Sequence, residues 1–244
     1  MQPTVVIARL TVSGLLGRRR AAVLMLLPLV LLVLAGVFRA AAGPDLRTAV
    51  ALLGGLALGA VVPLVCVVVG TGVIGPEIED GSILYLLAKP LSRASIVLSK
   101  LAVAVAVAWA LLVPAVLVAG LVLVGSSERL AVAYAVAAAL AATAYCALFL
   151  LLAVVTRNAV VIGLLYALIW ETTIAGVVPG ARALSVRQWA LSLAEAVVGS
   201  AATGLGVHSD VAPGAGLVLL LTVTVAATAY AVSRLRTLRL GGDD

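Results

Sequence analysis

The chain has 244 residues, of which 64% are hydrophobic and only 11% are charged, and its formal net charge is +6. A soluble domain carries about 25% charged residues, so this composition excludes an ordinary soluble protein and indicates a surface that mostly faces lipid. The basic residues cluster at the ends of apolar runs, which is typical of membrane topology signals and is evidence against nucleic-acid binding.

Residues 1–20 precede the first long apolar run. Positions 3–17 predict a short interfacial helix on the cytoplasmic surface; the alternative is a simple extension of the first membrane helix. Arg18, Arg19 and Arg20 followed by an apolar run are similar to a secretory signal peptide. Because twenty residues are long for the charged part of such a peptide, and because the run is long enough to span a bilayer, we expect a retained first membrane helix.

Six apolar runs approach or exceed the roughly 17–25 residues that a membrane-spanning helix needs. Pro63 and Pro114 lie inside two of the runs and predict kinks, while the spacing of Gly55 and Gly59 predicts a close approach of two helices. The sequence therefore predicts an all-α polytopic membrane protein with six transmembrane helices in a single domain, 1–244. The runs lie at about 21–38, 51–75, 101–124, 130–155, 159–178 and 215–233.

Lysine and arginine favour the cytoplasmic side of a membrane, which orients the six predicted spans. With the N-terminus in the cytoplasm, eleven of the sixteen basic residues fall in inner segments. An even number of spans then places both termini in the cytoplasm, and we expect the protein in the inner or plasma membrane of a cell. The five basic residues in outer segments are Arg39, Arg47, Arg129, Arg182 and Arg187.

The inner segment 76–100 concentrates the polar signals of the chain. Three carboxylates stand where a short helix would begin, and there they complement the positive end of the helix dipole. Pro90 ends that helix, because proline disfavours helical geometry in the residue before it. Ser92 is placed to cap a second helix that continues through Lys100 into the third span. The sequence predicts two amphipathic helices parallel to the membrane and facing the cytoplasm.

The order of residues in this segment is specific. Acidic residues are followed by Gly-Ser, a leucine-rich turn, Pro-Leu-Ser-Arg and a lysine: Glu77, Glu79, Gly81, Ser82, Leu86, Pro90, Ser92, Arg93 and Lys100. This pattern closely resembles the cytoplasmic loop between the second and third spans of ABC-2 type permeases, the membrane subunits of ABC exporters. Six spans, cytoplasmic termini and a helical outer segment before the last span are also similar to that family, so the resemblance covers nearly the whole chain.

The resemblance implies a coupling helix at about residues 77–88. Such a helix docks in a cleft of a separate ATP-binding subunit and passes ATP-driven motion to the membrane helices. An exposed acidic helix end suits this role, because charge pairing sets register and association rate; the alternative is a solvated loop whose charges merely prevent insertion into the membrane. The expected contacts with the ATP-binding subunit are Glu77, Glu79, Asp80, Gly81, Ser82, Leu84, Leu86 and Leu87.

A nucleotide site is not expected in this chain. The glycines at Gly14 and Gly17 lack the lysine and hydroxyl residue that complete a Walker A motif, so they do not form a phosphate-binding loop. We expect a chain that is no enzyme and holds no cofactor, with ATP and Mg²⁺ bound by the partner subunit. One six-span half has one candidate coupling helix, so a second copy or a paralogous permease is the other expected partner, besides membrane lipid.

The outer segment 179–214 predicts an amphipathic or re-entrant helix. Ser185 is the predicted N-cap, and Trp189 lies on the apolar stripe, where it would anchor the helix at the outer membrane interface. In the family, outer re-entrant helices often occupy this position. One hypothesis is therefore that the segment shapes the outer mouth of a transport pathway; the other is that it is a passive surface helix.

Glu171 is the most unusual single residue. It lies about a dozen residues into the fifth predicted span, where a carboxylate is costly unless it is paired, protonated or facing a cavity. The functional hypothesis is a pathway or gating residue, whose Glu171→Gln variant alters transport more than folding. The structural alternative is a hydrogen-bond or salt-bridge partner, with Arg182 and Arg39 as candidates.

Other reactive side chains carry weaker signals. Cys66 and Cys146 each lie inside an apolar run and are predicted to be small buried hydrophobic residues. His208 is the only histidine, and no cluster of ligands accompanies it, so a metal site is not expected. Neither a Ser-His-Asp arrangement nor a pair of catalytic acids is apparent.

Three function classes follow from these features. The first is the permease subunit of an ATP-driven exporter, whose Ala-, Val- and Leu-rich spans suit a hydrophobic or amphipathic substrate. The second is an ABC-type membrane partner in the maturation of an extracytoplasmic protein. The third is an ATP-independent channel or carrier, which would need intramembrane polar or broken-helix sites. The sequence does not give the substrate and does not choose between a homodimer and a heterodimer.

Overall fold

The computed structural model describes residues 18–80, 92–124, 129–174, 182–199, 202 and 206–237. Every regular element within these ranges is a helix. The predicted helix at 3–17 and most of the predicted coupling segment lie outside the described residues. The elements are α2 (Arg18–Ala42), α3 (Leu46–Ala51), η1 (Leu52–Val61), α4 (Val62–Gly72), α5 (Gly75–Glu79), α7 (Arg93–Val124), α8 (Leu130–Val155), α9 (Ala159–Leu165), η2 (Tyr166–Ile174), α12 (Val186–Val198) and α14 (Pro213–Thr237).

Five helical stretches are long and apolar enough to cross a membrane, which confirms the polytopic all-α prediction in its coarser form. The fifth predicted span, 159–178, corresponds to an apolar helix of which the structure describes Ala159–Thr173 as the membrane-compatible part. That stretch is shorter than a bilayer requires, so a sixth span stays a prediction. The five stretches are Ala22–Ala41, Leu46–Ile78, Arg93–Val124, Leu130–Val155 and Pro213–Leu235.

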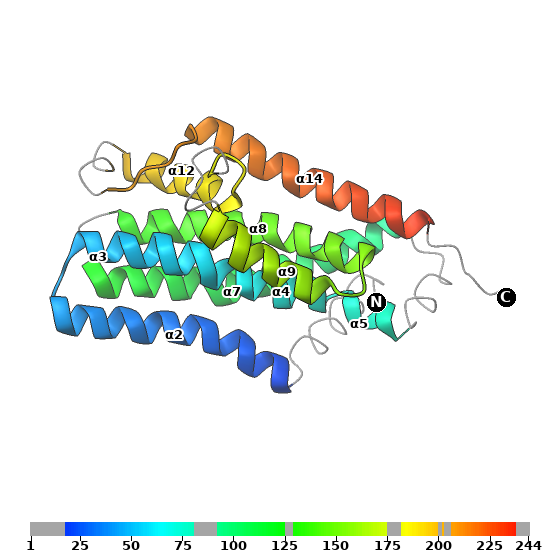
Figure 1. Ribbon diagram of the computed structural model, residues 1–244, viewed down its shortest axis with the longest axis horizontal. Helices are drawn as coiled ribbons and strands as arrows, with labels where there is room; N and C mark the ends of the chain where they lie inside the picture. The colour runs from blue at the N-terminus through cyan, green and yellow to red at the C-terminus, as the bar shows by residue number, and fades with distance from the viewer. Residues whose placement is uncertain are drawn as a thin grey trace.

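The long helices lie side by side and define two ends of the bundle (Figure 1). One end, called here the α5 end, holds α5, the start of α7, the turn between α8 and α9, and the last residues of α14. The opposite end, called the α12 end, holds α12 and the connection between α2 and α3. The helix α8 lies in the centre and packs against α7, α14, α4 and α12.

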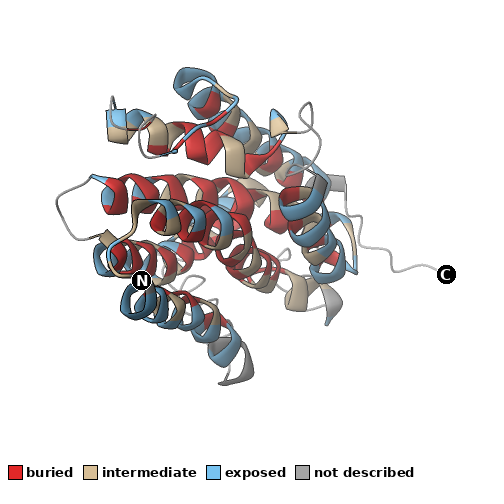
Figure 2. Cartoon of the chain, turned by 60° about the vertical axis from the view of Figure 1, so that its left-hand side comes forward, coloured by how far each residue is buried: buried red, intermediate tan, exposed pale blue. Residues whose placement is uncertain are grey.

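Small residues let the helices approach α8 closely. A Cβ on Gly70 of α4 would lie 2.9 Å from the Cβ of Phe149, and a Cβ on Gly120 of α7 would lie 2.7 Å from the Cβ of Ala131. Membrane helices gain little from burying apolar surface against each other, so such close packing supplies much of their association energy. Figure 2 shows the buried residues concentrated in the middle of the bundle and the exposed ones on its outer helices.

The outward faces of α2 and α14 are apolar. Met25 of α2 is 59% exposed and Val225 of α14 is 66% exposed. In a soluble protein these faces would be an aggregation hazard. In a multi-pass membrane protein they are the surface that contacts lipid, because the hydrocarbon core of a bilayer solvates apolar side chains.

Two π-helical segments, η1 and η2, run beside each other. At the end of η1 the N–H of Val62 bonds the carbonyl of Ala57, five residues back, and α-helical bonding then resumes in α4. Pro63 stands at this change. Proline has no N–H and its ring clashes with the carbonyl four residues back, so it suits the place where the hydrogen-bonding pattern changes. The kink predicted at Pro63 stays a prediction.

We expect Gly120→Ala to lower the free energy of unfolding by about 1–3 kcal/mol, because the added methyl group must displace the backbone of α8. Gly36→Ala in α2 is the matched control. Nothing lies within 4 Å of the position of its added Cβ, so it should be neutral or slightly stabilising. Unfolding of both variants in detergent micelles by added denaturant measures the difference. Equal stability of the two variants would contradict the close packing of α7 on α8.

Candidate functional site

The chain turns sharply at Val73 and Ile74 into α5, which carries the acidic residues singled out in the sequence. Pro76 occupies the first turn of α5, where its missing N–H costs nothing. Glu77 lies in the same turn, near the positive end of the helix dipole. Asp80 follows the helix as its C-cap residue and is exposed. The structure thus has a short acidic helix at the α5 end, but this helix ends at Glu79, so of the three carboxylates only Glu77 lies in its first turn.

Lys100 ties this acidic helix to the bundle. Its side chain is fully buried, and its Nζ donates hydrogen bonds to the carbonyl of Val73 at 2.6 Å and to Oε1 of Glu77 at 2.7 Å. The Glu77 side chain is 34% exposed. One lysine therefore joins the end of α4, the start of α5 and the first turns of α7 through charge-assisted bonds. The sequence predicts Lys100 only as a motif residue; its pairing with Glu77 is a structural finding.

The second helix of the predicted loop begins as expected. The Oγ of Ser92 accepts a hydrogen bond from the N–H of Ser95 at 3.1 Å, so Ser92 caps α7. Arg93 is the first residue of α7 and is half-buried. From there α7 continues without interruption through Lys100 to Val124. The other residues predicted to contact the ATP-binding subunit or to complete the motif lie outside the described residues: Gly81, Ser82, Leu84, Leu86, Leu87 and Pro90.

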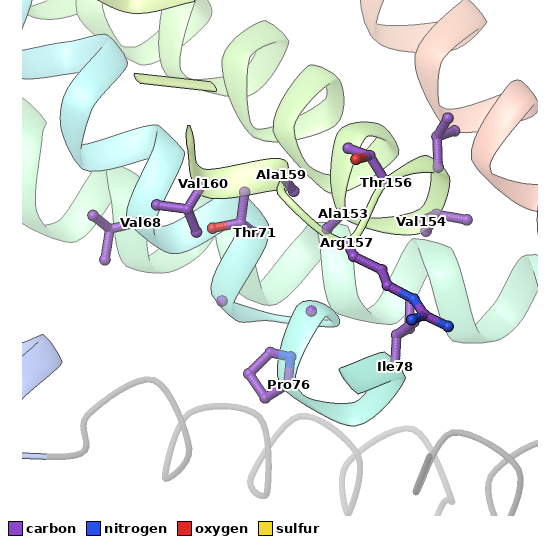
Figure 3. A pocket seen from close by; sticks show the side chains of 13 residues that line it. Val68, Thr71, Pro76, Ile78, Ala153, Val154, Thr156, Arg157, Ala159 and Val160 are labelled. Carbon is purple, nitrogen blue, oxygen red and sulfur yellow. The ribbon is translucent and has the colours of Figure 1, made fainter. Parts of the chain in front are cut away.

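A pocket of about 640 Å³ opens at the α5 end, between α4, α5 and the α8–α9 turn (Figure 3). Its wall is apolar along α4 and α9, as at Val68 and Val160. Arg157 extends from the α8–α9 turn along one edge of the pocket (Figure 3). The turn is tight, with only Thr156, Arg157 and Asn158 between the two helices. The size is typical of a small-molecule site.

Glu171 lies in η2 and is fully buried. Its Oε1 accepts hydrogen bonds from the hydroxyl of Tyr166 at 3.0 Å and from the N–H of Val186 at 3.1 Å. Its Oε2 accepts a hydrogen bond from the hydroxyl of Ser185. The carboxylate therefore sits at the N-terminus of α12, where free N–H groups and the helix dipole favour an anion.

The ion pair considered for Glu171 is wrong. Its hydrogen bonds come from hydroxyls and a backbone N–H, while Arg182 pairs with Asp210 at 3.5 Å and Arg39 donates to the carbonyl of Leu123. The N-terminus of α12 supplies the positive potential that stabilises the Glu171 carboxylate, a role for which an arginine was the sequence-based candidate. Because neither described pocket includes Glu171 among its lining residues, its role in a pathway stays a prediction.

The helix α12 forms where the sequence predicts it, and Ser185 caps it by accepting from the N–H of Gln188 at 3.3 Å. The expected interfacial anchor is wrong, because Trp189 is only 5% exposed. Its indole N–H donates to the carbonyl of Ala183 at 2.8 Å. The apolar stripe of α12 packs on α8 and α14 instead of on lipid headgroups.

Arg187 joins α12 to the second span. Its Nε donates to the carbonyl of Gly54 at 2.9 Å, and its side chain lies 3.4 Å from where a Cβ of Gly59 would be. Nothing lies within 4 Å of a Cβ built on Gly55. The predicted close approach of helices at Gly55 and Gly59 is therefore wrong. Gly59 makes room for an arginine, a contact that spacing along the chain does not reveal.

A comparison of the amino-acid sequence with models of known protein families shows which family the chain belongs to. A family model described as ABC-2 family transporter protein matches residues 38–188, from the last turns of α2 to the first turn of α12. The chain belongs to the ABC-2 transporter family. A search of curated proteins found no match to the sequence.

As an ABC-2 family member, the chain is a multi-pass membrane permease of the kind that works with an ABC ATP-binding partner. The family match includes α5, Lys100, the pocket and Glu171. For this permease the α5 end brings together three predicted residues, Glu77, Asp80 and Lys100. Arg157 carries no sequence signal of a binding role, because a single positive charge in a short turn between two apolar runs is also typical of a topology signal.

Proposed function

We propose that this permease is the membrane-spanning subunit of an ATP-binding cassette exporter, which moves a hydrophobic or amphipathic substrate outward. ATP and Mg²⁺ are bound by a separate subunit, and this chain hydrolyses nothing itself. The observation that carries the proposal is the acidic helix α5, whose exposed end is fixed to the bundle by the buried Lys100. A docking element has to be both accessible and rigidly attached, and α5 combines the two.

The distribution of charge supports a cytoplasmic α5 end. Eleven of the sixteen lysines and arginines belong to the segments on that side of the predicted topology. Cytoplasmic segments are enriched in these residues in proteins of the cell's inner or plasma membrane. In this orientation α5 and the pocket face the cytosol, and α12 lies at the outer side.

Coupling follows from the contacts of Lys100. A partner that grips Asp80 and the residues after it displaces α5. Because Lys100 bonds both Val73 and Glu77, that displacement is carried to the end of α4 and the start of α7 together. These two helices both pack on α8. A push at the α5 end thus acts on the centre of the bundle without passing through a flexible joint.

A second permease completes the pathway in this proposal. The chain offers one acidic docking helix, whereas alternating exposure of a central cavity requires two halves that move against each other. The second half is either another copy of this chain or a similar permease. The apolar outer faces of the bundle are compatible with contacts to lipid and to such a partner.

Purification of the tagged chain from its native membrane tests the proposal. We expect an ATPase with Walker motifs to co-purify, and we expect Glu79→Lys with Asp80→Lys to reduce its recovery about tenfold, since reversed charges repel the docking cleft. Asp210→Lys, which reverses an exposed acid at the α12 end, is the matched control and should leave recovery unchanged. Full recovery with the α5 reversal would contradict docking at α5, and the absence of any co-purifying ATPase from the parent chain would favour an ATP-independent carrier.

A further inference from the structure

The pocket at the α5 end spans the boundary between the apolar and the polar part of the bundle. Val68 and Val160, on its deep side, belong to membrane-compatible helices. Arg157, on its edge, stands two residues beyond the span that ends at Val155. Along α4, the four-residue step from Val68 to Gly72 corresponds to about 6 Å of depth at 1.5 Å per residue. The pocket, of about 640 Å³, therefore has room for the part of an apolar tail that adjoins a polar head at Arg157.

The polar groups of the pocket favour a negative head group. Among the lining residues that the structure describes, Arg157 is the only charged one, and it is exposed. Of the two lining hydroxyls, Thr71 donates to the carbonyl of Val67, whereas Thr156 accepts from the N–H of Asn158 and keeps its own O–H as a donor. The guanidinium of Arg157 and the hydroxyl of Thr156 thus offer donors to the pocket, and the planar fork of the guanidinium matches the oxygens of a phosphate or carboxylate.

We propose that this pocket binds an anionic amphiphile drawn from the cytoplasmic leaflet, and that such amphiphiles are the substrate class of the permease. The inference rests on the proposed orientation and on export. The tail lies between α4 and α9 against Val68 and Val160, and the head group bonds Arg157. The site adjoins α5, since Pro76 and Ile78 also line it. Movement of α5 by the ATP-binding subunit therefore changes the shape of the site itself.

The binding experiment uses the full chain in lipid nanodiscs without ATPase or ATP. The probes are phosphatidylglycerol and phosphatidylcholine, each with a photoreactive group in one acyl chain. We expect the anionic probe to label residues 68–78 and 153–160 at least about fivefold more than the zwitterionic one, as one basic side chain near a membrane surface allows. Arg157→Gln should remove this preference, and Val160→Trp should reduce labelling by both probes.

Two matched controls separate the pocket from general lipid contact. Arg129→Gln removes an exposed arginine at the opposite end of α8, and Val161→Trp enlarges an exposed residue that does not line the pocket. Both should label as the parent chain does. Equal labelling by the two probes in the parent chain, or labelling that Arg157→Gln and Val160→Trp leave unchanged, would overturn the site.

The substrate class is tested in proteoliposomes that contain the permease with its ATP-binding subunit. We expect ATP to move fluorescent phosphatidylglycerol to the far leaflet about fivefold faster than phosphatidylcholine, and we expect Arg157→Gln to abolish the difference. Equal rates for the two lipids would overturn the substrate class. The two proposals can fail separately. Photolabelling needs no ATPase, so the binding site can be confirmed even if no ATP-binding partner is found. Conversely, a partner that docks on α5 supports the export proposal even if photolabelling fails.

Discussion

Replacement of Glu77 by alanine should lower the free energy of unfolding of this permease by about 3–5 kcal/mol. The reason is the burial of Lys100, which has no exposed surface and whose Nζ lies 2.7 Å from the Glu77 carboxylate. Without Glu77 the ammonium group is left in the bundle with only the carbonyl of Val73 as a described partner. A buried charge without its counterion is among the few point changes with effects this large.

Lys100 and Glu77 differ in burial, so removal of one partner should cost more than removal of the other. Lys100→Met should cost less, about 1–2 kcal/mol, because Glu77 is 34% exposed and water can solvate its carboxylate. The double variant Glu77→Ala with Lys100→Met should be more stable than Glu77→Ala alone. Denaturant unfolding of the four proteins in micelles gives this double-mutant cycle. If Glu77→Ala proves as stable as the parent chain, or less damaging than Lys100→Met, the ion pair does not hold α5.

Glu171→Ala should lower the free energy of unfolding by about 3–5 kcal/mol, whereas Glu171→Gln should cost less than about 1.5 kcal/mol. Alanine leaves the hydroxyls of Tyr166 and Ser185 and the N–H of Val186 without their acceptor. Glutamine keeps one oxygen for the first turn of α12 and offers an N–H to the Ser185 hydroxyl. Ser185→Ala, which removes one donor and the cap, should fall between them, at about 1–2 kcal/mol.

Transport by the same variants decides whether Glu171 has a further role. If the carboxylate only caps α12, the export rate should follow the amount of folded protein in all three variants. A folded Glu171→Gln variant that has lost ATP-driven export would instead identify Glu171 as a pathway or gating residue. Melting curves and export rates measured on one preparation of proteoliposomes separate these two results.

Local structure was predictable from the sequence because its causes are local. Ser92 and Ser185 cap the helices expected of them, since a hydroxyl at a helix start bonds an N–H three residues ahead wherever the helix lies. Cys66 and Cys146 are buried as their apolar surroundings predict. The tight turn around Arg157 also follows from a polar pair between two long apolar runs.

Partners across the bundle were not predictable in the same way. The sequence places Glu171 and Trp189 correctly along the chain, but it does not show that α12 folds back against α8 and α14. This packing gives Glu171 a helix N-terminus in place of an arginine, and it buries the indole that was expected at the membrane interface. Lys100 likewise meets Glu77 only because α5 turns back toward α7. In each case the sequence does not show which residue or helix is the neighbour in the folded bundle.

The pump mechanism depends on a cytosolic α5 end that an ATP-binding subunit covers. Asp80→Cys tests this directly with a membrane-impermeant maleimide, because Asp80 is exposed and both native cysteines are buried. We expect Asp80→Cys to be labelled in inside-out vesicles stripped of the ATPase and to be protected when the ATPase is added back. In intact cells Asp80→Cys should not be labelled, whereas Arg47→Cys, at the other end of the bundle, should react. Labelling of Asp80→Cys from outside intact cells would contradict the mechanism.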